Sequence, residues 1–412
     1  MKLRMMRLPA LKLLIGALLL AVGSGVLAGN TQVELSAGID GFVDDNYGLS
    51  TGTKQDVEGT NQYTKAALGY ESETTRADLG FNWVDVYLTD DSAKENDYYD
   101  LFSSYRYDLQ TSHVKASLKM RKDTTLADEV LISGPVSSEA DRSQYFMDLG
   151  FGHQFDEYFS LLTSVSMQEL QFESEDIDLL EFQYGAVSIQ PSYGYAENAA
   201  VYGNIFSSLV SYEEITQEDM FKAGRLTFYA PEESKTSGAS LGWRNQLTAT
   251  AFVDVSLGYR ESNYENQFQV LGFQPLALES KSEGLIFNGR FLWESERTSS
   301  EISISQENTT NSVGDTVEES QLWIDTRYNL SEVTFSTFRV SWQEQRNETD
   351  VREQDLTSYK FSADLYWQLD PNLQLKAGVR HLIREIQQRL QEDAESTRVS
   401  VGIKWNMNPI VW

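Results

Sequence analysis

The last stretch of the chain, residues 397–412 (TRVSVGIKWNMNPIVW), alternates between two kinds of side chain with a period of two residues. Because successive side chains of a β-strand point to opposite faces, this alternation predicts a strand with one apolar and one polar face. The apolar series is Val399, Val401, Ile403, Trp405 and Met407. Such a strand fits the wall of a membrane barrel, and it also fits the edge of a soluble sheet packed on a core.

The same alternation recurs about eight times as a hairpin unit: an alternating segment, a tight polar turn, a second alternating segment and a longer acidic loop. Tight turns are predicted at 71–75, 110–112, 155–158, 196–198, 248–250, 295–299, 331–333 and 370–372. With a first strand near 33–42 and the terminal strand, we expect about 18 strands (16–18) in sequential hairpins, with both ends of the chain at the short-turn end. Residues 213–237 fit this scheme least well, since 220–229 could form a strand or a folded loop.

Three features favour a membrane barrel over a soluble sandwich or solenoid. Short turns alternate with long loops along nearly the whole chain, and many segments have the ~9–11 residues that cross a bilayer obliquely. Aromatic residues rim the apolar faces, as interfacial girdles do, and these are Trp83, Trp243, Trp293, Trp342, Trp367 and Trp405. A sheet in hydrocarbon leaves no edge unpaired, so such strands must close. The predicted fold is an all-β, transmembrane, antiparallel up-and-down β-barrel with short periplasmic turns and long acidic extracellular loops.

The first residues of the chain are typical of an export signal. Lys2, Arg4 and Arg7 precede an apolar run over 13–22, and small residues follow up to Ala28. The run is short for a spanning helix, which needs ~20 apolar residues, so a cleaved signal peptide is favoured over an uncleaved anchor. We therefore predict a signal peptide over 1–28 and one barrel domain over 29–412.

Composition narrows the class of protein further. The net charge of −29 argues against a nucleic-acid partner, because nucleic-acid binding relies on clustered Lys and Arg. The 41% of hydrophobic and 12% of aromatic residues exceed what a disordered chain carries. With no cysteine, the chain has neither disulfides nor thiolate metal sites.

Basic residues recur on the polar faces of the predicted strands, with fewer acidic residues among them, while most of the acid falls in the loops. We predict that the lumen is lined by Arg76, Arg106, Lys115, Lys119, Arg121, Asp254, Arg260, Arg290, Arg327, Arg339, Lys376, Arg380, Arg398 and Lys404. Two interpretations stay open. The charges could neutralise one another and brace the wall, or unpaired Arg and Lys could form a track for anionic or hydroxyl-rich solutes.

The sequence shows no convincing catalytic set and no metal site. The three histidines lack a nucleophile and an orienting acid nearby, with His113 expected in a turn and His153 and His381 on the apolar faces. The acidic pairs Asp44-Asp45, Asp90-Asp91 and Asp128-Glu129 could hold Ca²⁺, but they lack the spacing of a dedicated calcium loop. We expect no enzyme activity and no cofactor.

The chain resembles the porin-2-like group of outer-membrane β-barrel porins and the related barrels associated with exopolysaccharide export and PEP-CTERM loci. The resemblance covers the arrangement of the chain, and its most local element is Gly38-Ile39-Asp40-Gly41-Phe42 followed by Asp44-Asp45-Asn46-Tyr47. Trp412 departs from the usual ending of such barrels, because it follows Pro409 and falls out of phase with Trp405.

These observations together predict a non-enzymatic barrel in the bacterial cell outer membrane. It would act as a porin-like channel for hydrophilic solutes, or as an accessory to exopolysaccharide export. The expected partners are outer-membrane lipid and lipopolysaccharide, the barrel-insertion machinery, and a hydrophilic solute or polysaccharide. Two alternatives are a plugged structural or adhesive barrel whose acidic loops bind ligands or cations, and a soluble secreted all-β binding protein.

Overall fold

The computed structural model describes residues 29–47, 56–89, 98–124, 141–173, 181–310, 316–347, 355–386 and 393–411. The predicted signal peptide over 1–28 lies outside the described residues. Strands make up nearly all of the described chain, which confirms the all-β prediction. Among the described residues, no helix is both long and apolar enough to cross a membrane.

Within the described residues the elements follow one another along the chain as strands, with one short helix after the ninth strand. They are β1 (Asn30–Asp44), β2 (Val57–Glu71), β3 (Thr75–Leu88), β4 (Tyr98–Asp108), β5 (Ser112–Thr124), β6 (Asp141–Gln154), β7 (Phe159–Phe172), β8 (Phe182–Ala196), β9 (Ala199–Tyr212), α3 (Gln217–Lys222), β10 (Thr227–Thr248), β11 (Ala251–Val270), β12 (Leu276–Glu294), β13 (Thr298–Thr310), β14 (Thr316–Asn329), β15 (Thr334–Asn347), β16 (Leu356–Asp370), β17 (Leu373–Ile386), β18 (Ala394–Asn406) and β19 (Ile410–Val411).

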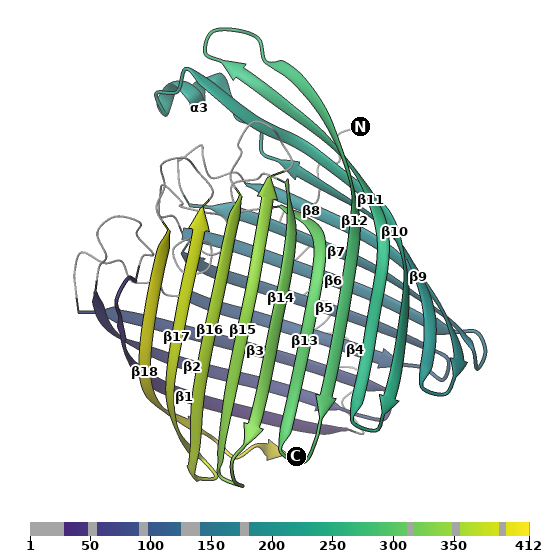
Figure 1. Cartoon of the computed structure of the whole chain (residues 1–412), viewed down its shortest axis with the longest axis vertical. Coiled ribbons are helices and arrows are strands. Elements are labelled where there is room, and N and C mark those ends of the chain that lie inside the picture. The colour runs from purple at the N-terminus through teal and green to yellow at the C-terminus, as the bar shows by residue number, and fades with distance from the viewer. Residues whose placement is uncertain are drawn as a thin grey trace.

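Each strand pairs antiparallel with its neighbours in the sequence, and the sheet closes because β1 also pairs with β18 (Figure 1). The closing register runs from Ser36 opposite Asn406 to Asp44 opposite Arg398. The described chain thus forms a closed antiparallel barrel of 18 long strands, as predicted. β19 is a two-residue continuation that pairs Ile410 and Val411 with the start of β1, and Trp412 lies outside the described residues.

The short polar turns that the sequence predicts lie together at one end of the barrel, called here the turn end (Figure 1). Short polar side chains hold these turns by accepting hydrogen bonds from the backbone. Asp370 Oδ1 accepts from Asn372 N at 2.7 Å, and Asp156 Oδ1 accepts from Phe159 N at 2.7 Å. This is the chemistry that makes Asp and Ser frequent in turns. The opposite end is called the loop end.

The two faces of the wall differ as the alternation predicts. On β18, Val399, Val401 and Trp405 point outward and are exposed, whereas Arg398 and Lys404 occupy the other face. The same division holds on the other strands, so the exposed large apolar side chains form a band around the outside. A contiguous apolar surface of this extent is unfavourable in water. Contact with lipid is therefore the best explanation for the apolar band.

The first and last strands are joined by a set of hydrogen bonds at the loop end, called here the seam. The buried Asp44 carboxylate accepts from Ser396 Oγ at 2.7 Å and from Arg398 Nε at 2.9 Å. Next to it, Asp45 Oδ1 accepts from Thr397 N at 2.6 Å. Nearer the turn end, Gly402 leaves room for the Asp40 carboxylate, with which any side chain at that position would collide. The segment that carries the family resemblance is therefore the part of the chain that closes the barrel.

The segment 213–237, where the sequence left strand and loop open, contains both a helix and a strand. Thr216 caps α3, since its hydroxyl accepts from Asp219 N while the Asp219 carboxylate accepts from Thr216 N. The helix buries Met220 against a hydrophobic cluster formed by Leu170, Phe172, Phe182, Val210, Tyr212, Met220 and Phe228. The members of this cluster on β7–β9 face inward, so α3 lies against the inner face of the wall at the loop end.

β10, β11 and β12 are 22, 20 and 19 residues long, and they extend past the other strands at the loop end (Figure 1). Their extra length carries polar outward side chains. Lys281 Nζ lies 3.2 Å from a carboxylate oxygen of Glu261 and 2.7 Å from one of Glu283. An outward face of this kind suits water and not lipid, so the extension stands beyond the apolar band.

Candidate functional site

The inner face of the barrel is the candidate functional site. All of the predicted lumen-lining residues occupy inward positions of their strands, opposite in register to the exposed apolar series. Arg260 differs from the other predicted residues because its side chain is almost fully buried, at 1% exposed. It lies 3.3 Å from Glu318, so it faces inward without contacting an open lumen.

Most of the inward basic side chains have a carboxylate partner on the same strand or a neighbouring one. Near the turn end, Arg76 pairs with Asp78 at 3.4 Å and Arg106 with Asp108 at 2.8 Å. Elsewhere on the wall the pairs are Lys119–Asp100, Arg121–Asp123, Arg290–Glu301, Arg339–Asp325, Lys376–Asp364 and Arg398–Asp44. The lumen is therefore lined largely by ion pairs, which favours the bracing interpretation of these residues over a continuous unpaired basic track.

Three of the predicted lumen-lining cations have different surroundings. Lys115 and Lys404 have no carboxylate within 4.0 Å in the part of the chain that the structure describes, and the Arg327 guanidinium lies 3.9 Å from the centre of the Phe335 ring. Lys115 stands directly opposite Arg106, which stands opposite Arg76 on the next strand. This row of basic residues across β3–β5 gives the turn-end mouth a local positive potential that Asp78 and Asp108 only partly offset.

The lumen is accessible to water at mid-height. The inward side chains of Lys119, Arg290 and Arg339 are 44%, 48% and 57% exposed, although they point away from the outer surface. β5 lies on the far side of the barrel from β12 and β15, so the exposure occurs on both sides of the lumen (Figure 1). A barrel plugged by its own side chains would bury these groups. The described residues thus enclose a space that is accessible to solvent.

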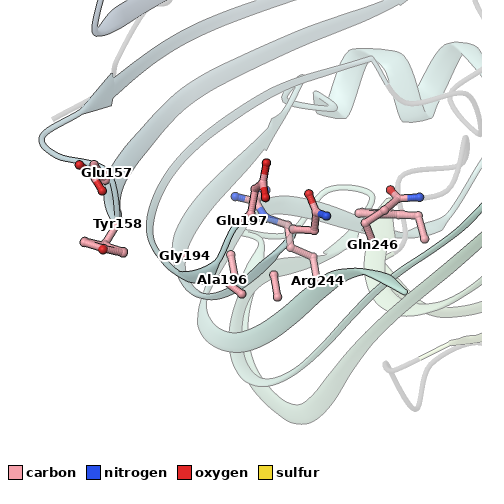
Figure 2. A pocket seen from close by; sticks show the side chains of 11 residues that line it. Glu157, Tyr158, Gly194, Ala196, Glu197, Arg244 and Gln246 are labelled. Carbon is pink, nitrogen blue, oxygen red and sulfur yellow. The ribbon is translucent and has the colours of Figure 1, made fainter. Parts of the chain in front are cut away.

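A recess of about 730 Å³ widens the lumen at the turn end. Figure 2 shows Glu157 and Tyr158 on one side of it and Glu197, Arg244 and Gln246 on the other. Arg244 donates to Ser192 Oγ at 3.1 Å and lies 5.7 Å from the centre of the Tyr202 ring, whose hydroxyl donates to Asp254. Polar side chains with partners in the wall thus line the recess at the turn end.

The six predicted girdle tryptophans all occupy outward positions. Trp243, Trp293, Trp367 and Trp405 lie near the turn ends of their strands, and Trp83 and Trp342 lie nearer the loop ends. Two levels of outward tryptophan separated along the axis are the arrangement that interfacial anchoring requires.

Lumenal aromatic residues were missed by the sequence reasoning, chiefly Tyr63, Tyr202, Trp323 and Tyr366. The alternation could have identified them. Trp323 lies two residues before Asp325 and four before Arg327 on the same strand, so it must share their inward face. Abundant outward aromatics hide this small set, because composition alone does not distinguish the two faces.

One Ser–His pair lies on the outside of the barrel near the turn end. Ser112 Oγ is 2.7 Å from His153 Nδ1, and the imidazole packs edge-on against Phe155. No carboxylate contacts the other ring nitrogen among the described residues, so the pair lacks the third group that orients a catalytic histidine. His113, expected in a turn, instead lies at the start of β5 and faces inward beside Gly152.

The acidic loop pairs proposed for Ca²⁺ have separate outcomes. Asp44 and Asp45 are engaged in the seam, where protein donors occupy their oxygens. Asp90-Asp91 and Asp128-Glu129 lie outside the described residues. Within the described chain, no group of three or more His, Asp or Glu side chains is arranged to hold a metal ion.

No family model and no curated protein matches the chain. Among solved structures, it is similar to the FrpB iron transporter from Neisseria meningitidis (F3-3 variant), with 9% identity, a TM-score of 0.45 and coverage of 94% of this chain and 83% of that one. It is also similar to the outer membrane protein opdK from Pseudomonas aeruginosa, with 10% identity, a TM-score of 0.42 and coverage of 92% and 99%. The ferric yersiniabactin uptake receptor FyuA from Yersinia pestis gives 9% identity, a TM-score of 0.43 and coverage of 92% and 80%. Similarity at this level carries no conclusion about function, which therefore rests on the geometry of the barrel.

Proposed function

We propose that the protein is a non-enzymatic channel of the bacterial outer membrane through which hydrophilic solutes diffuse. The observation that supports this most directly is the exposure of Lys119, Arg290 and Arg339 inside a closed wall whose outer face is apolar. A barrel of about 18 strands is wide enough to leave an aqueous lumen, and here the inner side chains do not fill it.

The pairing of the lumenal charges predicts weak ion selectivity. A paired Arg or Lys presents little net field to a passing ion, since the partner carboxylate offsets it within a few ångströms. We therefore expect a conducting pore that discriminates modestly between cations and anions. Transport is passive in this proposal, because the described wall offers a path and no moving element within it.

Planar-bilayer recording of the purified, folded protein tests the channel. We expect stepwise conductance in potassium chloride. A folded sample that inserts but never conducts would contradict the proposal and favour the plugged structural or adhesive barrel instead.

A charge-removal variant tests which face conducts. Replacing Lys115, Lys119 and Arg121 with Gln leaves Asp100 without its basic partners and removes three lumenal cations, while Asp123 keeps Arg142, so the reversal potential in a salt gradient should shift towards cation selectivity. Lys122→Gln is the matched control, because Lys122 lies on the same strand, points outward and pairs with Glu173 at 2.6 Å. An equal shift in both variants would mean that β5 does not line the conducting path.

The family resemblance supports a narrower role in polysaccharide export, with lipopolysaccharide and the insertion machinery as further partners. We retain this role as a proposal, because a turn-end recess lined by polar groups is compatible with a hydrated polymer. Loss of surface polysaccharide on deletion of the gene, restored by the wild-type chain, would support it, and unchanged polysaccharide would argue against it.

A further inference from the structure

A second recess, of about 540 Å³, lies on the inner wall across β13, β14 and β15. Its inward side chains are Glu301, Gln321, Trp323, Asp325, Arg339, Ser341 and Gln343. It is remote from the turn-end recess and includes the only tryptophan that faces inward among the described residues.

Trp323 has small partners across both adjacent strands. Directly opposite it stand Ser303 on β13 and Ser341 on β15, and the indole lines the recess beside longer polar side chains. The indole N–H has no hydrogen-bond partner among the described residues. Trp323 also lies apart from the hydrophobic cluster under α3, so it does not serve core packing. A half-buried aromatic platform with a free donor in a hydrated wall is suited to a ligand that is apolar on one face and hydrogen-bonding at its edge.

Polar groups surround this platform on both sides along the axis. Gln321 and Gln343 lie towards the loop end, and each carries an amide that both donates and accepts. Glu301, Asp325 and Arg339 lie towards the turn end, where Asp325 and Arg339 pair with each other and Glu301 pairs with Arg290. Each charge in the recess is thus offset by a partner, and each carboxylate keeps oxygen lone pairs for further donors.

We propose that this recess is a binding subsite for a neutral sugar ring. A pyranose offers a face of C–H groups that stacks on an indole and a rim of hydroxyls that bond to carboxylates, amides and a guanidinium. The offset charges disfavour an anionic ligand, which would need an uncompensated cation. The proposal rests on the proposed channel function and names one class of solute that the channel retains on its way through.

The test is block of single-channel current by maltohexaose added to either side of the bilayer. We expect reversible closures whose frequency rises with sugar concentration, and Trp323→Ala should weaken the apparent affinity roughly tenfold, as loss of one stacking platform implies. Trp367→Ala is the control for loss of a tryptophan, because Trp367 is exposed on the outward face of β16. Gln321→Ala provides a second variant that keeps the indole, and it should weaken block by a smaller factor.

The outcomes separate the inference from the function on which it rests. Conductance without sugar block, or block that Trp323→Ala and Gln321→Ala leave unchanged, would overturn the subsite and leave the channel intact. Stronger block by hexagalacturonate, an anionic sugar of the same number of rings, would overturn the neutral-sugar assignment. Absence of conductance in the wild-type protein would overturn the channel, and the subsite with it.

Discussion

The seam between β1 and β18 makes a sharp prediction about what keeps the barrel closed. The Asp44 side chain is 2% exposed and that of Arg398 is 22% exposed, and Asp44 accepts from Arg398, Ser396 and Asn46 N. Asp44→Asn preserves the size of the side chain but removes its charge and replaces one of its two acceptor oxygens with an NH2 group. Whichever way the amide turns, this NH2 faces a donor, either Arg398 Nε or Asn46 N, and the charge-assisted bond is lost.

The size of the effect follows from the burial of the pair. Removing one member of a buried ion pair costs ~3–5 kcal/mol, since the remaining charge loses both water and its partner. Here Arg398 keeps some access to the lumen and lies over the Phe42 and Tyr47 rings, at 4.4 and 5.4 Å from their centres. We therefore expect Asp44→Asn to lower the free energy of unfolding by about 2–4 kcal/mol.

Reversible urea unfolding in detergent micelles, followed by tryptophan fluorescence and gel mobility, measures this change. Asp108→Asn is the matched control: its partner Arg106 and Asp108 are both well exposed at the turn end, so the loss should be about 0–1 kcal/mol. Asp44→Asn combined with Arg398→Met should be more stable than Asp44→Asn alone, because the unpaired cation is gone. Equal losses in the Asp44 and Asp108 variants would refute the reasoning that the seam stabilises the barrel.

Three further predictions test the outer face, the inward helix and the loop end. Val401→Lys places a charge at mid-strand on the outward face and should destabilise the protein in lipid by about 2–4 kcal/mol. Ser400→Lys, on the lumenal face, should destabilise it much less. Equal losses of stability in urea titrations in liposomes would contradict a lipid-facing exterior. Met220→Ala removes a fully buried side chain and should cost roughly 2–5 kcal/mol of local packing, seen as faster proteolysis within 213–226, whereas the exposed Phe221→Ala should cleave at the wild-type rate. Burial raises the pKa of Glu181 above its ordinary 4.5, with the carboxylate of Glu213 adding to the shift, so its stabilising contribution is complete below 4.5 and is lost as the pH rises through the folded-state pKa. The urea midpoint of Glu181→Gln relative to wild type should therefore be higher at pH 7.5 than at pH 5, and a constant difference would rule out this titration.

The alternation and the turn chemistry allowed the barrel to be predicted almost completely, and the exceptions have physical reasons. A period of two residues defines both faces of every strand, and the Asp- and Ser-containing turns define the turn end. α3 escaped prediction because a six-residue helix has too little periodicity to detect, and its single buried residue, Met220, belongs to a cluster with residues of four strands, β7–β10. The length of β10–β12 escaped because polar outward residues such as Glu261 and Lys281 look like loop once the strand leaves the apolar band.

The lumenal site was predicted in outline only. The two-residue alternation identified which Arg and Lys residues face inward. Whether each of them forms an ion pair depends on which residues face each other across neighbouring strands. Arg290 meets Glu301 only because β12 and β13 pair in one particular register. Trp323 shows a similar limit: it matters because both of its cross-strand neighbours are serine, a fact that requires the register of two strand pairs.

The seam also sets the order in which the barrel can form. Apart from the short β1–β19 pairing beside the seam, every other strand pair joins neighbours in the sequence, whereas the bond from Ser396 to Asp44 spans 352 residues. Contacts of such long range gain stability only after the intervening chain is already ordered, because the entropy of closing a long flexible loop must otherwise be overcome first. The wall should therefore assemble hairpin by hairpin, and the aspartates after the first strand should find their partners in the last step of folding.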